Sequence, residues 1–286
     1  MDFNNLIFPA PKYDPAYTYN YKEEIIFIPK PIKNPNEPSQ YIPAIFLKTH
    51  PKIPVKNYII FFHGNAEDIF GARNMAERVL NKLNMNIIIV EYPGYSIYDS
   101  PKDSNTILED TLIVCDHLLS SIENITEENI FVFGRSIGTS PAIYLASNRK
   151  PSGLFLVSAF TSIGAVAKNL VGFLKIFLND RFKSIEYIKN VTCPIIFIHG
   201  QKDPLIPYKE TQMLKEACDC PTEVLFPEQM THNEYDLDED IIDPIYKFVQ
   251  KHCCFDETDK GNLPIIKDEF YFIPEDIEKK IYGMKQ

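Results

Sequence analysis

The stretch IFVFGRSIGTSPAIYLAS, residues 130–147, decides the fold of the chain. It begins with an apolar run, Ile130–Phe133, that is typical of a buried strand. The run ends at residues 134–138, GRSIG, and apolar residues then recur at helical spacing. A strand, a sharp turn and a helix form the context in which a G-x-S-x-G sequence presents a nucleophilic serine. A plain strand-to-helix turn is the alternative interpretation.

Ser136 lies at the centre of this turn. A turn this sharp strains the serine backbone and tolerates only small neighbours, which explains Gly134 and Gly138. It raises the hydroxyl clear of the sheet and places it where a helix begins, so that unpaired N–H groups favour developing negative charge. The sequence therefore predicts that Ser136 is a nucleophile.

Length and composition limit the class of protein. The chain has 286 residues, 45% of them hydrophobic, and can bury a large core. Its formal net charge is −10 and it has no Lys/Arg-rich run, which argues against a nucleic-acid partner. The six cysteines show no C-x-x-C spacing and residues 1–11 do not resemble a signal peptide, so we expect reduced thiols and a cytoplasmic location. We expect neither a metal nor a cofactor.

Apolar runs and segments of helical periodicity alternate along the chain. Two strand-like runs, Glu24–Ile28 and Ile42–Lys48, are expected to form an antiparallel pair. Later runs are fully apolar, as buried central strands are, and helical segments separate them. The later predicted strands are Asn57–Phe62, Ile87–Glu91, Ile130–Phe133, Leu154–Val157, Ile195–His199 and Thr222–Phe226, and the predicted helices are Gly71–Asn84, Ser104–Ile122, Tyr208–Ala217 and Glu239–Val249.

This alternation predicts an α/β fold with a mainly parallel central sheet and helices on both faces. In such a sheet the site lies outside the carboxyl ends of the strands. We divide the chain into an N-terminal extension (1–23), a catalytic domain (24–251) with a short helical, cap-like insertion at about 162–190, and a C-terminal extension (252–286). The C-terminal extension is expected to be partly helical from Pro274 onward.

A serine hydroxyl needs a base within hydrogen-bonding reach and a third group that orients the base. Among the six histidines, His232 follows the last predicted strand by a short loop, which places it at the same edge of the sheet as Ser136. We therefore expect His232 to be the base, with a surface loop histidine as the alternative. The others are interpreted as turn residues after strands (His63, His199), a helix residue (His117) and loop residues (His50, His252).

The orienting acid is expected in the loop after the preceding strand, where Asp203 lies. An ordinary turn aspartate before a proline is the alternative for this residue, and Asp236 and Asp180 are the alternative acids. The chain order Ser136, Asp203, His232 is the order of one known class of serine hydrolases.

The reaction of a serine nucleophile with an acyl group also requires N–H donors for the tetrahedral oxyanion. They are typically the N–H after the nucleophile and one N–H from the loop after an early strand. Ile137 and Asn65 are at these places, and Ala66 is the alternative to Asn65.

Six stretches occur in a characteristic order: HGNAED, EYPGYS, GRSIGTSPAIYLAS, SAFTS, CPIIFIHGQKDPLIP and EQMTHNEYD. Through them the chain, from about Phe8 to Lys251, resembles the alpha/beta hydrolase domain-containing protein 17 family. The resemblance implies the α/β-hydrolase fold and a serine hydrolase that removes palmitate from protein cysteines. Its substrates would then be S-acylated proteins.

The resemblance also implies roles for individual residues. Ser136, Asp203 and His232 match the catalytic triad of the family, and Phe182, Ile185 and Ile188 match a packed segment before a later parallel strand.

Two features depart from the family. Its animal members have an acylated, cysteine-rich N-terminal segment that holds them at membranes, whereas residues 1–12 contain no cysteine, so peripheral membrane association is left open. Arg135 stands where glutamine is frequent in the family.

Residues 162–179 are apolar over more than one helical face. Packing against the core is the default interpretation of such a segment. The alternative is that it lines an acyl groove above the nucleophile, through Leu170, Phe173, Leu174 and Phe177. A triad does not distinguish thioesters from oxygen esters, so a carboxylesterase or serine peptidase of the same fold is the second hypothesis. A catalytically silent binding scaffold is the third.

Overall fold

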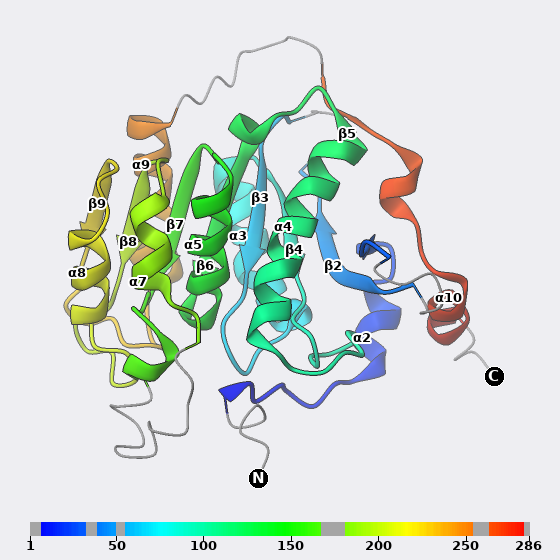
Figure 1. The fold of residues 1–286 in the computed structure, drawn as a ribbon, viewed down its shortest axis with the longest axis horizontal. Coiled ribbons are helices and arrows are strands. Elements are labelled where there is room, and N and C mark those ends of the chain that lie inside the picture. Colours follow the sequence, from blue (N-terminus) through cyan, green and yellow to red (C-terminus); the bar gives the residue numbers. More distant parts are fainter. Residues whose placement is uncertain (1–6, 33–38, 50–54, 167–180, 254–262, 283–286) are drawn as a thin grey trace.

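An eight-stranded sheet forms the centre of a computed structural model, which describes residues 7–32, 39–49, 55–166, 181–253 and 263–282 (Figure 1). Its strands are β1 (Ile25–Pro29), β2 (Tyr41–Leu47), β3 (Tyr58–Phe62), β4 (Asn86–Val90), β6 (Ile130–Arg135), β7 (Gly153–Val157), β8 (Ile195–Ile198) and β9 (Thr222–Leu225). The spatial order is β1-β2-β4-β3-β6-β7-β8-β9. The pairs β1-β2 and β2-β4 are antiparallel and the other pairs are parallel, which confirms the predicted α/β fold and its antiparallel opening pair.

The sheet is buried on both faces. Every residue of β3, β4, β6, β7 and β8 is buried, which explains why these strands are apolar throughout. Side chains of α4, α5 and α8 form the core on one face, and side chains of α3 and α9 form it on the other (Figure 1). The bounds are α3 (Ile69–Leu83), α4 (Ser104–Ser121), α5 (Thr139–Asn148), α8 (Lys209–Glu216) and α9 (Asp243–His252).

Two elements differ in extent from the sequence prediction. β6 runs to Arg135, beyond the predicted end, because it still pairs with β7 there. The helix predicted over Glu239–Val249 begins earlier, as a π-helix η5 (Leu237–Ile242), before it continues as α9. The Asp236 side chain accepts the first N–H groups of η5 and so fixes its start.

The sequence prediction missed α2 (Pro15–Asn20) and the pairing of β5 (Ile122–Glu123) with β10 (Ile265–Ile266). Strands of two residues are too short to show an alternating pattern. α2 does have a start signal, because the Asp14 side chain accepts the Ala16 N–H and a proline occupies the first helical position. The C-terminal helix predicted from Pro274 onward is present as α10 (Glu275–Tyr282).

Segments near both ends of the chain contribute to the core. Phe8 is 1% exposed and packs edge-on against Phe182, with ring centroids 6.1 Å apart. Phe270 is equally buried and packs on Phe46, with centroids 5.0 Å apart. Side chains from the predicted N-terminal and C-terminal extensions are therefore buried with those of the α/β domain, and the domain boundaries themselves stay predictions.

Candidate active site

The turn at Ser136 has the strained backbone that the sequence predicts. Ser136 has φ of 51° and begins the short 3-10 helix η2 (Ser136–Gly138), which leads into α5. A Cβ at Gly138 would lie 2.2 Å from the Phe62 carbonyl oxygen, and one at Gly134 would lie 2.8 Å from the Ala142 Cβ. Only glycine at these two positions allows the turn at Ser136 to pack this closely on β3 and α5.

The structure brings Ser136, His232 and Asp203 together at the carboxyl edge of the sheet. The Ser136 Oγ lies 3.0 Å from the His232 Nε2, and the His232 Nδ1 lies 2.7 Å from the Asp203 Oδ2. All three residues are buried. This hydrogen-bonded chain is the arrangement in which an imidazole can take a proton from a serine hydroxyl while a carboxylate orients the ring.

Asp203 is held in place by its own backbone loop. Its Oδ1 accepts the N–H groups of Leu205 and Ile206, both at 2.9 Å, which leaves Oδ2 for His232. Burial raises the pKa of Asp203, but hydrogen bonds from His199, His232 and the Ile206 N–H outweigh burial and hold the pKa well below its ordinary value. The carboxylate therefore stays ionised beside His232.

His199, expected from the sequence to be a turn residue, also lies against Asp203. Its Nε2 is 3.4 Å from the Asp203 Oδ2 and 2.8 Å from the Ile206 carbonyl oxygen, and its Nδ1 is 2.8 Å from the Thr211 Oγ1. His199 is fully buried, so it supports the acid from behind. The i, i+4 spacing of His199 and Asp203 is the one sequence signal that could have indicated this contact.

The alternative residues are placed elsewhere or lie outside the described residues. Asp236 caps η5, and Asp180 and His50 are not among the described residues. His117 is on α4 and stacks on Phe270. The prediction of a loop for His252 is wrong, because His252 is the last residue of α9.

The two predicted oxyanion donors belong to different loops. Ile137 is in the first turn of η2, where N–H groups have no intrahelical acceptor. Asn65 follows β3, and its side chain is fixed at both ends: Nδ2 donates to the Ile7 carbonyl at 2.7 Å, and Oδ1 accepts from the Tyr95 hydroxyl at 2.7 Å. Ala66, the alternative donor, has a left-handed backbone with φ of 60°.

A buried ion pair, His63 with Glu91, lies beneath this loop and was not predicted. The His63 Nε2 is 3.1 Å from the Glu91 Oε1, and its Nδ1 is 2.9 Å from the Gly64 carbonyl oxygen. Burial lowers the pKa of His63, but the hydrogen bond and charge of Glu91 outweigh it and raise the pKa. Glu91 also accepts the N–H groups of Tyr92 and Ile69, so the pair joins the ends of β3 and β4 to the start of α3.

Replacement of His63 by alanine is expected to lower the free energy of unfolding by about 3–5 kcal/mol, because it leaves Glu91 buried without its partner. Urea unfolding followed by circular dichroism measures the change. His252→Ala is the matched control, since His252 pairs with the partly exposed Glu223, and it should cost about 1 kcal/mol or less. Equal costs for the two variants would show that the His63 pair is not a structural anchor.

The predicted acyl-groove residues, Leu170, Phe173, Leu174 and Phe177, lie outside the described residues. Of the segment matched by the family resemblance, Phe182 and Ile188 are buried and Ile185 packs against the same core. The short helix α7 (Ser184–Tyr187) contains Ile185 and lies between Phe182 and Ile188 in the chain.

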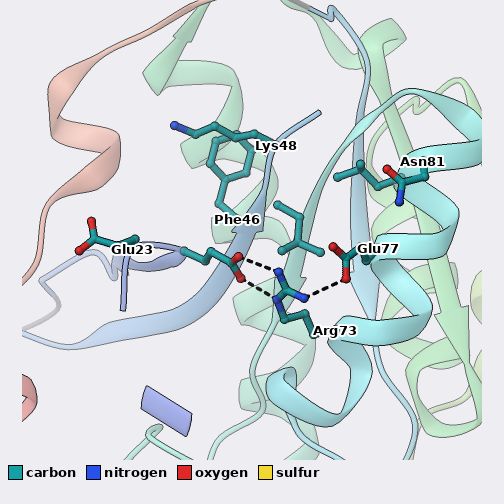
Figure 2. A pocket seen from close by; sticks show the side chains of 9 residues that line it. Glu23, Phe46, Lys48, Arg73, Glu77 and Asn81 are labelled. Atoms are coloured by element: carbon teal, nitrogen blue, oxygen red, sulfur yellow. Dashed lines mark hydrogen bonds and ion pairs between the residues drawn. The ribbon is translucent and has the colours of Figure 1, made fainter. Parts of the chain in front are cut away.

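A separate pocket of about 500 Å³ lies beside α3 and the β1-β2 edge (Figure 2). Arg73 is at its centre, where Glu24 holds the guanidinium through two contacts of 2.7 Å and Glu77 through one of 2.9 Å. None of the predicted site residues lines this pocket. Three glutamates, Glu23 among them, line the pocket together with two cations, Arg73 and Lys48, and two of the glutamates already pair with Arg73, so its charge does not favour an anion.

Within the described residues, no group of three or more His, Cys, Asp or Glu side chains is arranged to hold a metal ion. No helix among the same residues is both long enough and apolar enough to cross a membrane.

Comparisons with known proteins agree with the fold. No protein-family model matches the chain. The solved structure of 2,6-dihydroxy-pseudo-oxynicotine hydrolase superposes with a TM-score of 0.63 at 15% sequence identity, covering 88% of this chain and 74% of that one. The chain therefore has the α/β-hydrolase fold, with a serine at the turn from strand to helix.

Sequence similarity to curated relatives is higher than to the solved structure. It is 31% identical over 191 residues to alpha/beta hydrolase domain-containing protein 17C of Xenopus tropicalis, covering 67% of this chain and 61% of that protein. It is 29% identical over 210 residues to protein 17B of Homo sapiens, covering 73% and 71%. The chain has the α/β-hydrolase fold, and its homology to proteins 17B and 17C confirms the resemblance found in the sequence.

Proposed function

We propose that the protein is a serine hydrolase that cleaves acyl thioesters or esters through an acyl-enzyme, with palmitoylated protein cysteines as its substrates. The hydrogen-bonded chain from Ser136 through His232 to Asp203 is the observation that supports the reaction type. A catalytically silent scaffold has no need to keep a strained serine within 3.0 Å of a histidine.

In the proposed mechanism His232 takes the proton of Ser136, whose Oγ attacks the acyl carbonyl carbon. The N–H groups of Ile137 and Asn65 stabilise the oxyanion of the tetrahedral intermediate. The thiol or alcohol leaves with the proton from His232, and a water activated by the same imidazole then hydrolyses the acyl-enzyme. Asp203 keeps the ring in the correct tautomer and stabilises it when charged.

Thioesters suit this arrangement because a thiol has a pKa near 8.5 and leaves with less protonation than an amine. The choice of palmitoyl thioesters is supported by the resemblance to the protein 17 family. A cytoplasmic protein that meets membranes only peripherally would find such substrates at the membrane surface, and we propose this location together with the activity.

Turnover of three substrates tests the proposal: a palmitoyl-cysteine peptide, a short-chain nitrophenyl ester and an aminoacyl amide. We expect kcat/KM to be highest for the palmitoyl thioester and lowest for the amide, because the amine leaving group requires full protonation. An octanoyl-cysteine peptide is the matched control for chain length.

The outcomes separate the hypotheses. Preference for the amide would contradict the thioesterase proposal and favour a peptidase. Equal kcat/KM for the octanoyl and palmitoyl peptides would contradict a preference for long acyl chains. The proposal of a serine hydrolase would still stand.

A further inference from the structure

Arg135, the last residue of β6, precedes the proposed nucleophile and contacts two other loops of the site. Its Nη2 donates to the His232 carbonyl oxygen at 2.8 Å and to the Asn233 Oδ1 at 2.9 Å. Its Nη1 donates to the Glu67 Oε1 at 3.2 Å. One guanidinium therefore joins the loop of the proposed base to the loop that carries Asn65.

Glu67 transmits this contact to the oxyanion loop. The same Oε1 that accepts from Arg135 also accepts the Gly64 N–H at 2.6 Å. A Cβ at Gly64 would lie 2.6 Å from the Arg135 Nη1, so the loop packs against the guanidinium with no space between them. The next N–H along the chain is that of Asn65, one of the two proposed oxyanion donors.

We infer that Arg135 and Glu67 are positioning residues that fix the oxyanion loop and the His232 loop relative to Ser136. The inference rests on the proposed function, since it assigns how that reaction is aligned. Arg135 touches no reacting atom: it acts on His232 through the backbone carbonyl and on Asn65 through Glu67 and Gly64.

The geometry of the guanidinium suits this role. The side chain is 11% exposed, and its charged carbon lies 5.8 Å from the centre of the Tyr235 ring, so it is held between the two loops. A planar fork can donate in two directions at fixed angles, whereas the ammonium of lysine is a single point charge on a flexible chain. Lysine at this position would keep the charge and lose the simultaneous grip on both loops.

The test uses Arg135→Gln, Arg135→Lys and Glu67→Ala in the full chain, since alanine removes the oxygen that accepts from both Arg135 and the Gly64 N–H. Each variant is assayed with a short-chain nitrophenyl ester, and kcat is expressed per active site titrated with a fluorophosphonate. A trifluoromethyl ketone, which forms a tetrahedral oxyanion adduct with a serine, measures the alignment of the oxyanion donors. Arg149→Gln is the matched control, because Arg149 makes a two-point contact with Asp116 at an exposed site.

We expect kcat per titrated site to fall about 10- to 100-fold in Arg135→Gln and Glu67→Ala, with KM changed by about twofold or less. The inhibition constant of the ketone should rise by the same factor as kcat falls, because both depend on the oxyanion donors. Arg135→Lys should lie between wild type and Arg135→Gln. The double variant should lose less than the product of the two single losses, because the two side chains share the Arg135–Glu67 contact.

A purely structural role would give a different pattern. It would lower the titrated fraction or the melting temperature and leave kcat per titrated site and the ketone inhibition constant at the wild-type values. Wild-type kcat per titrated site and a wild-type ketone inhibition constant in Arg135→Lys and Glu67→Ala would overturn the inference even if Arg135→Gln does not fold. Wild-type protein without serine-dependent turnover would instead refute the proposed function.

Discussion

Replacement of Ser136 by alanine is expected to abolish fluorophosphonate labelling and to lower kcat for a thioester by roughly 10⁵- to 10⁶-fold. The Ser136 Oγ is the atom that would form the bond to the acyl group. Without the Ser136 hydroxyl, His232 has no serine proton to accept. Labelling in a gel and a steady-state thioester assay measure the two losses. Alanine retains the Cβ, so the turn at this position should still form.

Ser158 provides a matched control for this substitution. It directly follows β7 at the same edge of the sheet, has a left-handed backbone with φ of 55°, and is 1% exposed. Its buried hydroxyl has no hydrogen-bond partner in the described part of the chain. Ser158→Ala should therefore keep full labelling and full kcat. Labelling that persists in Ser136→Ala would show that another serine is the nucleophile.

The elbow and the residues at the strand ends could be predicted because each lies directly after an apolar run. Parallel strands bring their carboxyl ends to one edge, so Ser136, Asp203 and His232 were expected to meet although up to 96 residues separate them. The strands themselves are recognisable because their two buried faces require apolar side chains throughout.

The residues that support the site could not be predicted in the same way. His63 and Glu91 each directly follow a strand, but nothing in the sequence shows that β3 and β4 are neighbours with these residues facing each other. Arg135 and Glu67 are 68 residues apart, and their contact depends on how closely Gly64 lets the loop approach. Such contacts follow from three-dimensional packing, which hydrophobic periodicity does not encode.

Replacement of Asp203 by asparagine is expected to lower kcat by about 10⁴-fold without unfolding the protein. The amide oxygen can still accept the N–H groups of Leu205 and Ile206, so the loop keeps its shape. The amide nitrogen then faces the His232 Nδ1 and donates to it. The imidazole proton is driven to Nε2, where it points at the Ser136 Oγ and the ring can no longer accept the serine proton.

Asp236→Asn is the matched control, because Asp236 accepts two backbone N–H groups in the same way and was the alternative acid in the sequence. Asparagine is as good a helix cap as aspartate, so both stability and kcat should stay close to wild type. Steady-state kcat with a nitrophenyl ester and thermal unfolding measure the two variants side by side. A large loss in Asp236→Asn, with Asp203→Asn active, would reverse the assignment of the acid. Because the pKa of Asp203 is held well below its ordinary value, its carboxylate is ionised throughout the neutral range and can orient His232 there.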